Sequence, residues 1–145
     1  MKLLAAVDLS KASGYVTEAV HRVALATDAE VYVLHIIIPL PDMAGPEFNP
    51  VMEYQEMSER YRDEQDQLNE LVSQLVEADV NATAIMVQGD PVKTILQEAE
   101  RLDAELVVVG SHGHGMMFDA LMGSISAGVL RKSTNPVLVV PVRGL

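Results

Sequence analysis

Short apolar runs separated by longer amphipathic segments indicate that the chain alternates strands with helices. Five runs, rich in β-branched residues and typical of strands buried on both faces, cover residues 2–8, 30–38, 82–87, 106–109 and 137–140. The segments between them repeat apolar residues at helical spacing. This succession predicts a parallel sheet covered by helices on both faces.

Side chains that can satisfy the first backbone N–H groups of a helix mark several helix starts. Ser10 and Ser124 are candidate N-caps of the first and last helices, and Asp90 followed by Pro91 opens another. A long helix is expected over roughly residues 51–78. Its apolar stripe, with Glu64 as the lone polar exception, consists of Tyr54, Met57, Tyr61, Leu68, Leu71 and Leu75.

The predicted fold class is α/β, with a single doubly wound, five-stranded parallel sheet. Right-handed crossovers favour the flavodoxin-like strand order 3-2-1-4-5. In that order the first and fourth strands are neighbours, so Asp8 and the segment after Val109 face each other where the chain reverses direction. The length of 145 residues suits one domain over residues 1–145.

The segment after the fourth strand has the composition of an anion site. Gly110, Gly113 and Gly115 allow a ligand to approach the backbone closely, and Ser124 begins a helix whose N-terminus carries about half a positive charge. Backbone N–H groups in such a setting favour an anion such as phosphate. In the alternative interpretation, the glycines only form turns between the last strands.

The spacing Gly110-x2-Gly113-x9-Gly123-Ser124 resembles the nucleotide signature of the universal stress protein family, in which it marks the ATP-binding branch. The run Pro136-Val137-Leu138-Val139-Val140 adds to the resemblance, which covers essentially the whole chain. It implies an adenine nucleotide α-hydrolase-like fold, ATP with or without Mg²⁺ as the ligand, and dimers formed through residues 137–140.

The resemblance also implies a set of ATP-binding positions. These are Val7, Asp8, Ile36, Val109, Gly110, His112, Gly113, Gly123, Ser124, Ile125 and Ser126. The apolar strand ends would enclose the adenine, although such residues are often only core, and the glycine and serine positions would contact the ribose and phosphates. Asp8 can accept hydrogen bonds from the nucleoside or face a nucleotide-bound Mg²⁺; alternatively, it only braces its own loop.

The residues around the glycines bear on how much phosphate charge the site can hold. His112 is expected near phosphate and His114 exposed in the loop; no third ligand stands nearby, so no metal held by protein ligands is expected. Members of the family often have a basic side chain among the nine residues between Gly113 and Gly123. Here that stretch contains Asp119 and neither lysine nor arginine, which leaves little fixed positive charge to offset a triphosphate.

Other nucleotide and catalytic motifs are missing from the sequence. The glycines lack the spacing of a P-loop or of the G-x-G-x-x-G dinucleotide motif, and there is no G-x-S-x-G nucleophile elbow. No nucleophile stands out as paired with a general base. We therefore expect a regulatory, stress-response module that binds ATP. The alternatives are a slow ATP hydrolase or phosphoryl-transfer enzyme, and a nucleotide-free structural dimer.

The charge and hydropathy of the sequence restrict the classes of partner and the cellular location that are expected. A net charge of −11 without a basic stripe argues against a nucleic-acid partner. No apolar run is long enough to span a bilayer, and Asp8 ends the first one too early for a signal peptide, so a cytoplasmic protein is expected. The uncharged edge strand 137–140 invites pairing with a second copy, which predicts a homodimer; alternatively, a loop covers it.

Overall fold

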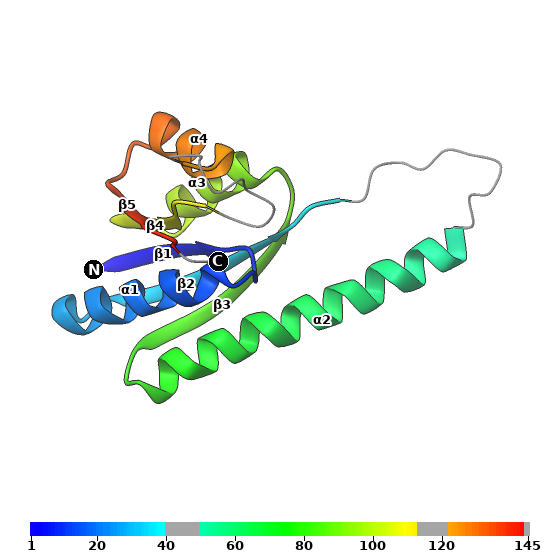
Figure 1. Cartoon of the computed structure of the whole chain (residues 1–145), viewed down its shortest axis with the longest axis horizontal. Coiled ribbons are helices and arrows are strands. Elements are labelled where there is room, and N and C mark those ends of the chain that lie inside the picture. The colour runs from blue at the N-terminus through cyan, green and yellow to red at the C-terminus, as the bar shows by residue number, and fades with distance from the viewer. Residues whose placement is uncertain (40–49, 113–121, 144–145) are drawn as a thin grey trace.

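The computed structural model describes residues 1–39, 50–112 and 122–143, and for residues 50–54 only the backbone (Figure 1). The elements are β1 (Lys2–Val7), α1 (Ala12–Thr27), β2 (Glu30–Ile37), α2 (Pro50–Glu77), β3 (Asn81–Gln88), α3 (Pro91–Arg101), β4 (Leu106–Gly110), α4 (Ser124–Lys132) and β5 (Val137–Val140). These bounds lie within one residue of the strands and the long helix that the sequence predicts. None of the helices in the described part is both long and apolar enough to cross a membrane.

The sheet has the strand order β3-β2-β1-β4-β5, and all neighbouring strands are parallel. This confirms the predicted fold class and strand order. Helices α1 and α2 cover one face of the sheet, and α3 and α4 cover the other (Figure 1).

Two hydrophobic clusters, one on each face, account for the apolar runs of the strands. In β1, Leu3 and Ala5 pack towards α1 and α2, whereas Leu4 packs towards α3 and α4. All three side chains are fully buried. A strand with a helix layer on each face has no solvent side, so its apolar residues run continuously instead of alternating with polar ones.

The predicted N-cap is correct for α3 and wrong by one residue for α1 and for α4. Asp90 caps α3, because its Oδ2 accepts a hydrogen bond from Lys93 N at 3.0 Å. Helix α1 begins at Ala12 with Lys11 as the N-cap, while Ser10 lies one residue earlier. Gly123 is the N-cap of α4, since its carbonyl oxygen already accepts the first helical hydrogen bond, from Ala127 N at 2.9 Å.

The expected apolar stripe of α2 is buried only along part of the helix. Leu68 and Leu75 are 1% and 3% exposed, whereas Tyr61 is 46% exposed. The prediction that Tyr61 belongs to the buried stripe is therefore wrong. A helix of 28 residues is about 42 Å long, whereas an eight-residue strand such as β3 spans about 27 Å. Towards its N-terminus, α2 therefore projects beyond the sheet (Figure 1).

Glu64, the polar exception in that stripe, belongs to a network that ties α2 to the sheet. Its Oε2 lies 3.1 Å from Nε2 of the buried His35, and the other ring nitrogen, Nδ1, lies 3.0 Å from Val7 O. Arg60 Nε donates to Glu64 Oε1 at 2.9 Å, and Arg60 also donates to Ile38 O at 3.1 Å. The network thus joins α2 to the carboxyl ends of β1 and β2.

The surroundings of Glu64 favour its ionised form. Burial would raise the pKa of this carboxyl group, but hydrogen bonds from His35 and Arg60 outweigh that effect. The pKa of Glu64 therefore lies below its ordinary value of 4.5. A carboxyl group that binds its proton more weakly in the folded chain stabilises the fold at neutral pH and stops doing so in acid.

We expect Glu64→Gln to reduce the acid sensitivity of the fold. The contribution of Glu64 is complete above about pH 4.5 and is lost as the pH falls through the lower, folded-state pKa. The amide does not titrate, so a stability difference of about 1 kcal/mol at neutral pH should shrink in acid. Urea unfolding at a series of pH values measures this difference in the free energy of unfolding. Glu59→Gln, a substitution of an exposed residue on the same helix, is the control. An identical pH slope in both variants would contradict the prediction.

Candidate functional site

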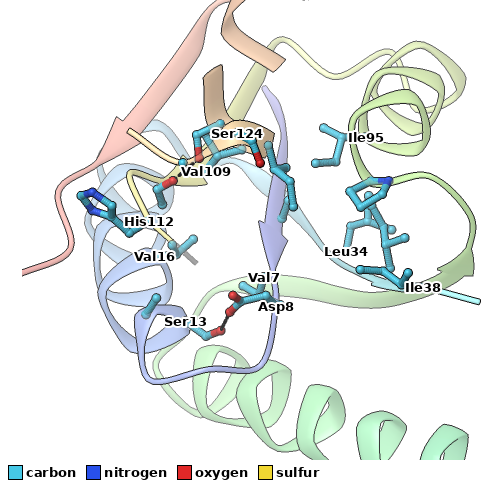
Figure 2. A pocket seen from close by; sticks show the side chains of 18 residues that line it. Val7, Asp8, Ser13, Val16, Leu34, Ile38, Ile95, Val109, His112 and Ser124 are labelled. Atoms are coloured by element: carbon cyan, nitrogen blue, oxygen red, sulfur yellow. Dashed lines mark hydrogen bonds between the residues drawn. The ribbon is translucent and has the colours of Figure 1, made fainter. Parts of the chain in front are cut away.

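A cavity of about 340 Å³ opens at the carboxyl ends of β1, β2 and β4 (Figure 2). Its lining comes from these strands and from α1, α3, α4 and the segments that connect them. It lies where the strand order reverses, because β1 and β4 are neighbours in the sheet while their helices cover opposite faces. Open α/β sheets bind ligands at such switch points.

The residues predicted for the site converge on this cavity. Those that line it are Val7, Asp8, Ile36, Val109, Gly110, His112, Gly123, Ser124, Ile125 and Ser126. Gly113 lies outside the described residues, as do Gly115, His114 and Asp119. The fold therefore gathers positions from three distant parts of the chain, and their contact with a nucleotide stays a prediction.

Asp8 lies on one wall of the cavity and also organises the turn between β1 and α1. Its Oδ1 accepts hydrogen bonds from Ser10 N at 3.0 Å and from Ser10 Oγ at 2.6 Å. It also accepts one from Ser13 Oγ at 3.4 Å (Figure 2). Its position is compatible with both predicted roles, contact with a bound nucleotide or its Mg²⁺ and bracing of the loop, and the hydrogen bonds show the second. The bonds hold the carboxylate in a defined orientation at the mouth of the cavity.

The interior of the cavity is predominantly apolar. Val7, Ile36 and Val109 come from the ends of three adjacent strands. Leu34, Ile38 and Ile95 extend this surface towards α3, opposite Val109 and Ser124 (Figure 2). An apolar slot with a few polar groups at its rim is the usual form of a site for a small molecule with a flat, largely apolar ring.

Hydrogen bonds hold the end of β4, at Gly110 and Ser111, close to the start of α4, at Gly123 and Ser126. Ser126 Oγ donates to Gly110 O, and Gly123 N donates to Ser111 O at 2.7 Å. The single hydroxyl proton of Ser126 is therefore directed at the backbone, so this residue shapes the loop in addition to lining the cavity. Ser124, by contrast, is exposed in the first turn of α4, where the helix N-terminus favours an anion.

Gly110 stands where a larger residue would not fit without adjustment. A Cβ added there would lie 3.2 Å from His112 O and 3.3 Å from Val16 Cγ2. Beside it, Ser111 Oγ accepts a hydrogen bond from Val142 N at 2.9 Å and lies 3.0 Å from His112 Nδ1. Ser111 thus connects the chain that leaves β5 with a side chain of the cavity.

Sequence reasoning missed part of the lining. The predicted site does not include Ser13, Leu34, Ile38 or Ile95, which also line the cavity. The periodicity of apolar residues indicates that such side chains are shielded from solvent. It does not indicate whether they pack against other side chains or line a cavity. For Ser13, the spacing from Asp8 was a usable signal, since a residue early in the helix can reach back to the strand end.

The donor groups suit an organic anion better than a metal ion held by the protein. Within the described ranges, no group of three or more His, Asp or Glu side chains could hold a metal. A divalent cation would need oxygen ligands from a bound phosphate in addition to Asp8. The apolar slot, the carboxylate and the α4 N-terminus together fit a nucleoside phosphate.

Comparison with known proteins agrees with this geometry. Residues 1–141 match the model of the universal stress protein family. The chain is 29% identical to universal stress protein YxiE of Bacillus subtilis, covering 96% of this chain and 97% of the relative. It is 31% identical to universal stress protein A homolog 1 of Coxiella burnetii, covering 95% and 94%. A universal stress protein of Mycolicibacterium smegmatis, 32% identical, is longer, and the chain spans 46% of it.

Solved structures share the fold. Protein MJ0577 superposes with a TM-score of 0.81 at 26% identity, covering 99% of this chain and 97% of its own. A universal stress protein in complex with cAMP gives 0.73 at 22% identity, covering 97% and 96%. The Archaeoglobus fulgidus protein in complex with dAMP gives 0.66 at 21%, covering 97% of both chains. The match over nearly the whole sequence shows that the chain belongs to the universal stress protein family.

Proposed function

We propose that this chain is a regulatory module that binds an adenine nucleotide in the cavity between β1 and β4. The observation that carries the proposal is the convergence of Asp8, Gly110 and the Gly123–Ser126 segment on one cavity. The structural relatives solved with cAMP and dAMP support an adenine nucleotide as the class of ligand. The family signature in the sequence makes ATP a candidate.

The proposed binding mode assigns a part of the ligand to each wall. The adenine lies in the apolar slot between Val7, Ile36 and Val109. The Asp8 carboxylate accepts hydrogen bonds from the nucleoside. The phosphates lie at the N-terminus of α4, where backbone N–H groups and the helix dipole favour negative charge. With ATP, a Mg²⁺ ion would contact phosphate oxygens and Asp8.

Binding is favoured over turnover because the cavity offers no activated nucleophile among its described residues. Ser111 lies within hydrogen-bond distance of His112, but it is buried and does not line the cavity. Ser126 directs its proton at Gly110 O. A hydroxyl engaged with the backbone, or buried outside the site, is poorly placed to attack a bound phosphate.

We further propose a homodimer formed through β5, the edge strand of the sheet. The carbonyl groups of Pro136, directly before β5, and of Val140 face β4, since they accept from Val107 N and Ser111 N. The backbone groups of Val139 therefore point to the outer edge. An apolar edge strand of this kind is completed by a second copy about a two-fold axis.

We expect adenine nucleotides to stabilise the protein and Asp8→Ala to weaken their binding. Ligand at about a hundred times its Kd adds about 2.7 kcal/mol to the free energy of unfolding. Loss of the Asp8 hydrogen bonds should raise Kd by about tenfold. Calorimetric titration measures Kd, and thermal unfolding without ligand separates a loss of stability from a loss of binding. Asp66→Ala, an exposed acid on α2, is the control.

Three further measurements distinguish the alternative functions. Release of ADP in proportion to protein, abolished by Asp8→Ala, would indicate an ATP hydrolase. Mass spectrometry of gently purified protein tests whether a nucleotide is retained. No thermal shift with any adenine nucleotide would indicate a nucleotide-free structural dimer and would contradict the proposal.

We expect Val139→Pro to separate the dimer. Proline removes the outward N–H at that position while leaving the bonds from β5 to β4 in place. Light scattering should give twice the mass of the 15.8 kDa chain for the unmodified protein and the mass of one chain for the variant. Far-UV circular dichroism is the control for folding. A variant that stays dimeric would place the interface elsewhere.

A further inference from the structure

The lysines and arginines do not contribute to the lining of the cavity, and those nearest to it in sequence, Lys11 and Lys93, lie one and two residues from lining positions. All ten lysines and arginines belong to the described residues, and none of them lines it. The stretches outside the description, 40–49, 113–121 and 144–145, contain no lysine or arginine in their sequence. His112 is therefore the single lining side chain of the described residues that can carry a positive charge, and Asp8 opposes it.

Two of these cations, Arg60 and Arg101, are engaged in ion pairs with glutamates. Arg60 is bonded to Glu64 and Ile38 O, and Arg101 forms an ion pair with Glu98 at 2.6 Å. Arg131 and Lys132 lie in the last turn of α4, about 10 Å along the helix axis from the first turn at the cavity. The overall charge of −11 adds a field that repels anions.

The positive potential available to a ligand comes mainly from the backbone. The N-terminus of α4 contributes about half an elementary charge, and its effect falls off within the first turn. A phosphodiester has one negative charge, and a terminal phosphate has nearly two at pH 7. A triphosphate brings several more charges into the same space, and the described residues offer no fixed cation to meet them.

We infer that the cavity selects adenine nucleotides by phosphate charge. Monophosphates of adenosine, cyclic or open, bind in preference to free ATP, and ATP competes only as its Mg²⁺ complex. This inference rests on the proposed function and specifies the ligand of the same site. Its physical basis is the balance between the α4 N-terminus, which no lining lysine or arginine assists, and the Asp8 carboxylate.

The first test is the order of affinities in the unmodified protein. Isothermal titration with cAMP, AMP and ATP in EDTA should give Kd values for the monophosphates at least about tenfold lower than that for ATP. Excess Mg²⁺ should narrow the difference, because the ion neutralises part of the triphosphate charge. Higher ionic strength should narrow it as well, since salt screens the repulsion.

The second test adds the missing charge. Ile125 lines the cavity and is 41% exposed, whereas Leu130 lies on the same helix, is 48% exposed and does not line it. Ile125→Lys should lower the ratio of the ATP Kd to the cAMP Kd by about tenfold. Leu130→Lys adds the same charge to the same helix and should change that ratio by less than about twofold.

Clear outcomes would overturn the inference. Free ATP that binds as tightly as the monophosphates in EDTA contradicts it, whatever the variants do. An equal change of the ratio in both lysine variants would mean that overall charge, not the cavity, sets the preference. If no adenine nucleotide binds, the proposed function fails and the inference with it. If all of them bind with equal affinity, only the inference fails.

Discussion

The parallel pairing of β1 with β4 is the constraint on which the rest of the molecule depends. The register from Leu3 opposite Leu106 to Ala5 opposite Val108 brings the carboxyl ends of both strands to the same edge of the sheet. The helices that follow these strands cover opposite faces, so the two chain segments diverge and leave a cavity between them. Asp8 and Gly110 are neighbours of this cavity only because the two strands are paired.

The walls of the cavity are held in place by their own hydrogen bonds. Asp8 organises the β1–α1 turn through hydrogen bonds from Ser10 and Ser13. At the start of α4, Ser126 donates to Gly110 O and Gly123 N donates to Ser111 O. A site organised in this way needs little rearrangement to receive a ligand, so less binding energy is lost in ordering it. In this acidic chain, the proposed attraction for an anionic ligand rests mainly on backbone dipoles.

The His35–Glu64–Arg60 network shows how the long helix α2 is positioned. Apolar packing by Leu68 and Leu75 buries one side of the helix, and the hydrophobic effect that drives it is not directional. The hydrogen bonds that join Glu64 to His35 and Arg60 to Ile38 O depend on direction and hold α2 in one register on the strand ends. Val7 and Ile38 both line the cavity, so the network also supports one of its walls.

The sequence by itself determined the strands, their order and most of the described positions around the cavity. Apolar runs, helical spacing and the glycine pattern are local signals, and the handedness of crossovers converts them into a topology. Only the tertiary structure decided that α4 starts after Gly123, that Ser126 bonds to Gly110, and that Glu64 meets His35. It also decided that Leu34 and Ile95 face a cavity. Each of these depends on which distant groups come within hydrogen-bond or van der Waals distance, and spacing along the chain does not contain that information.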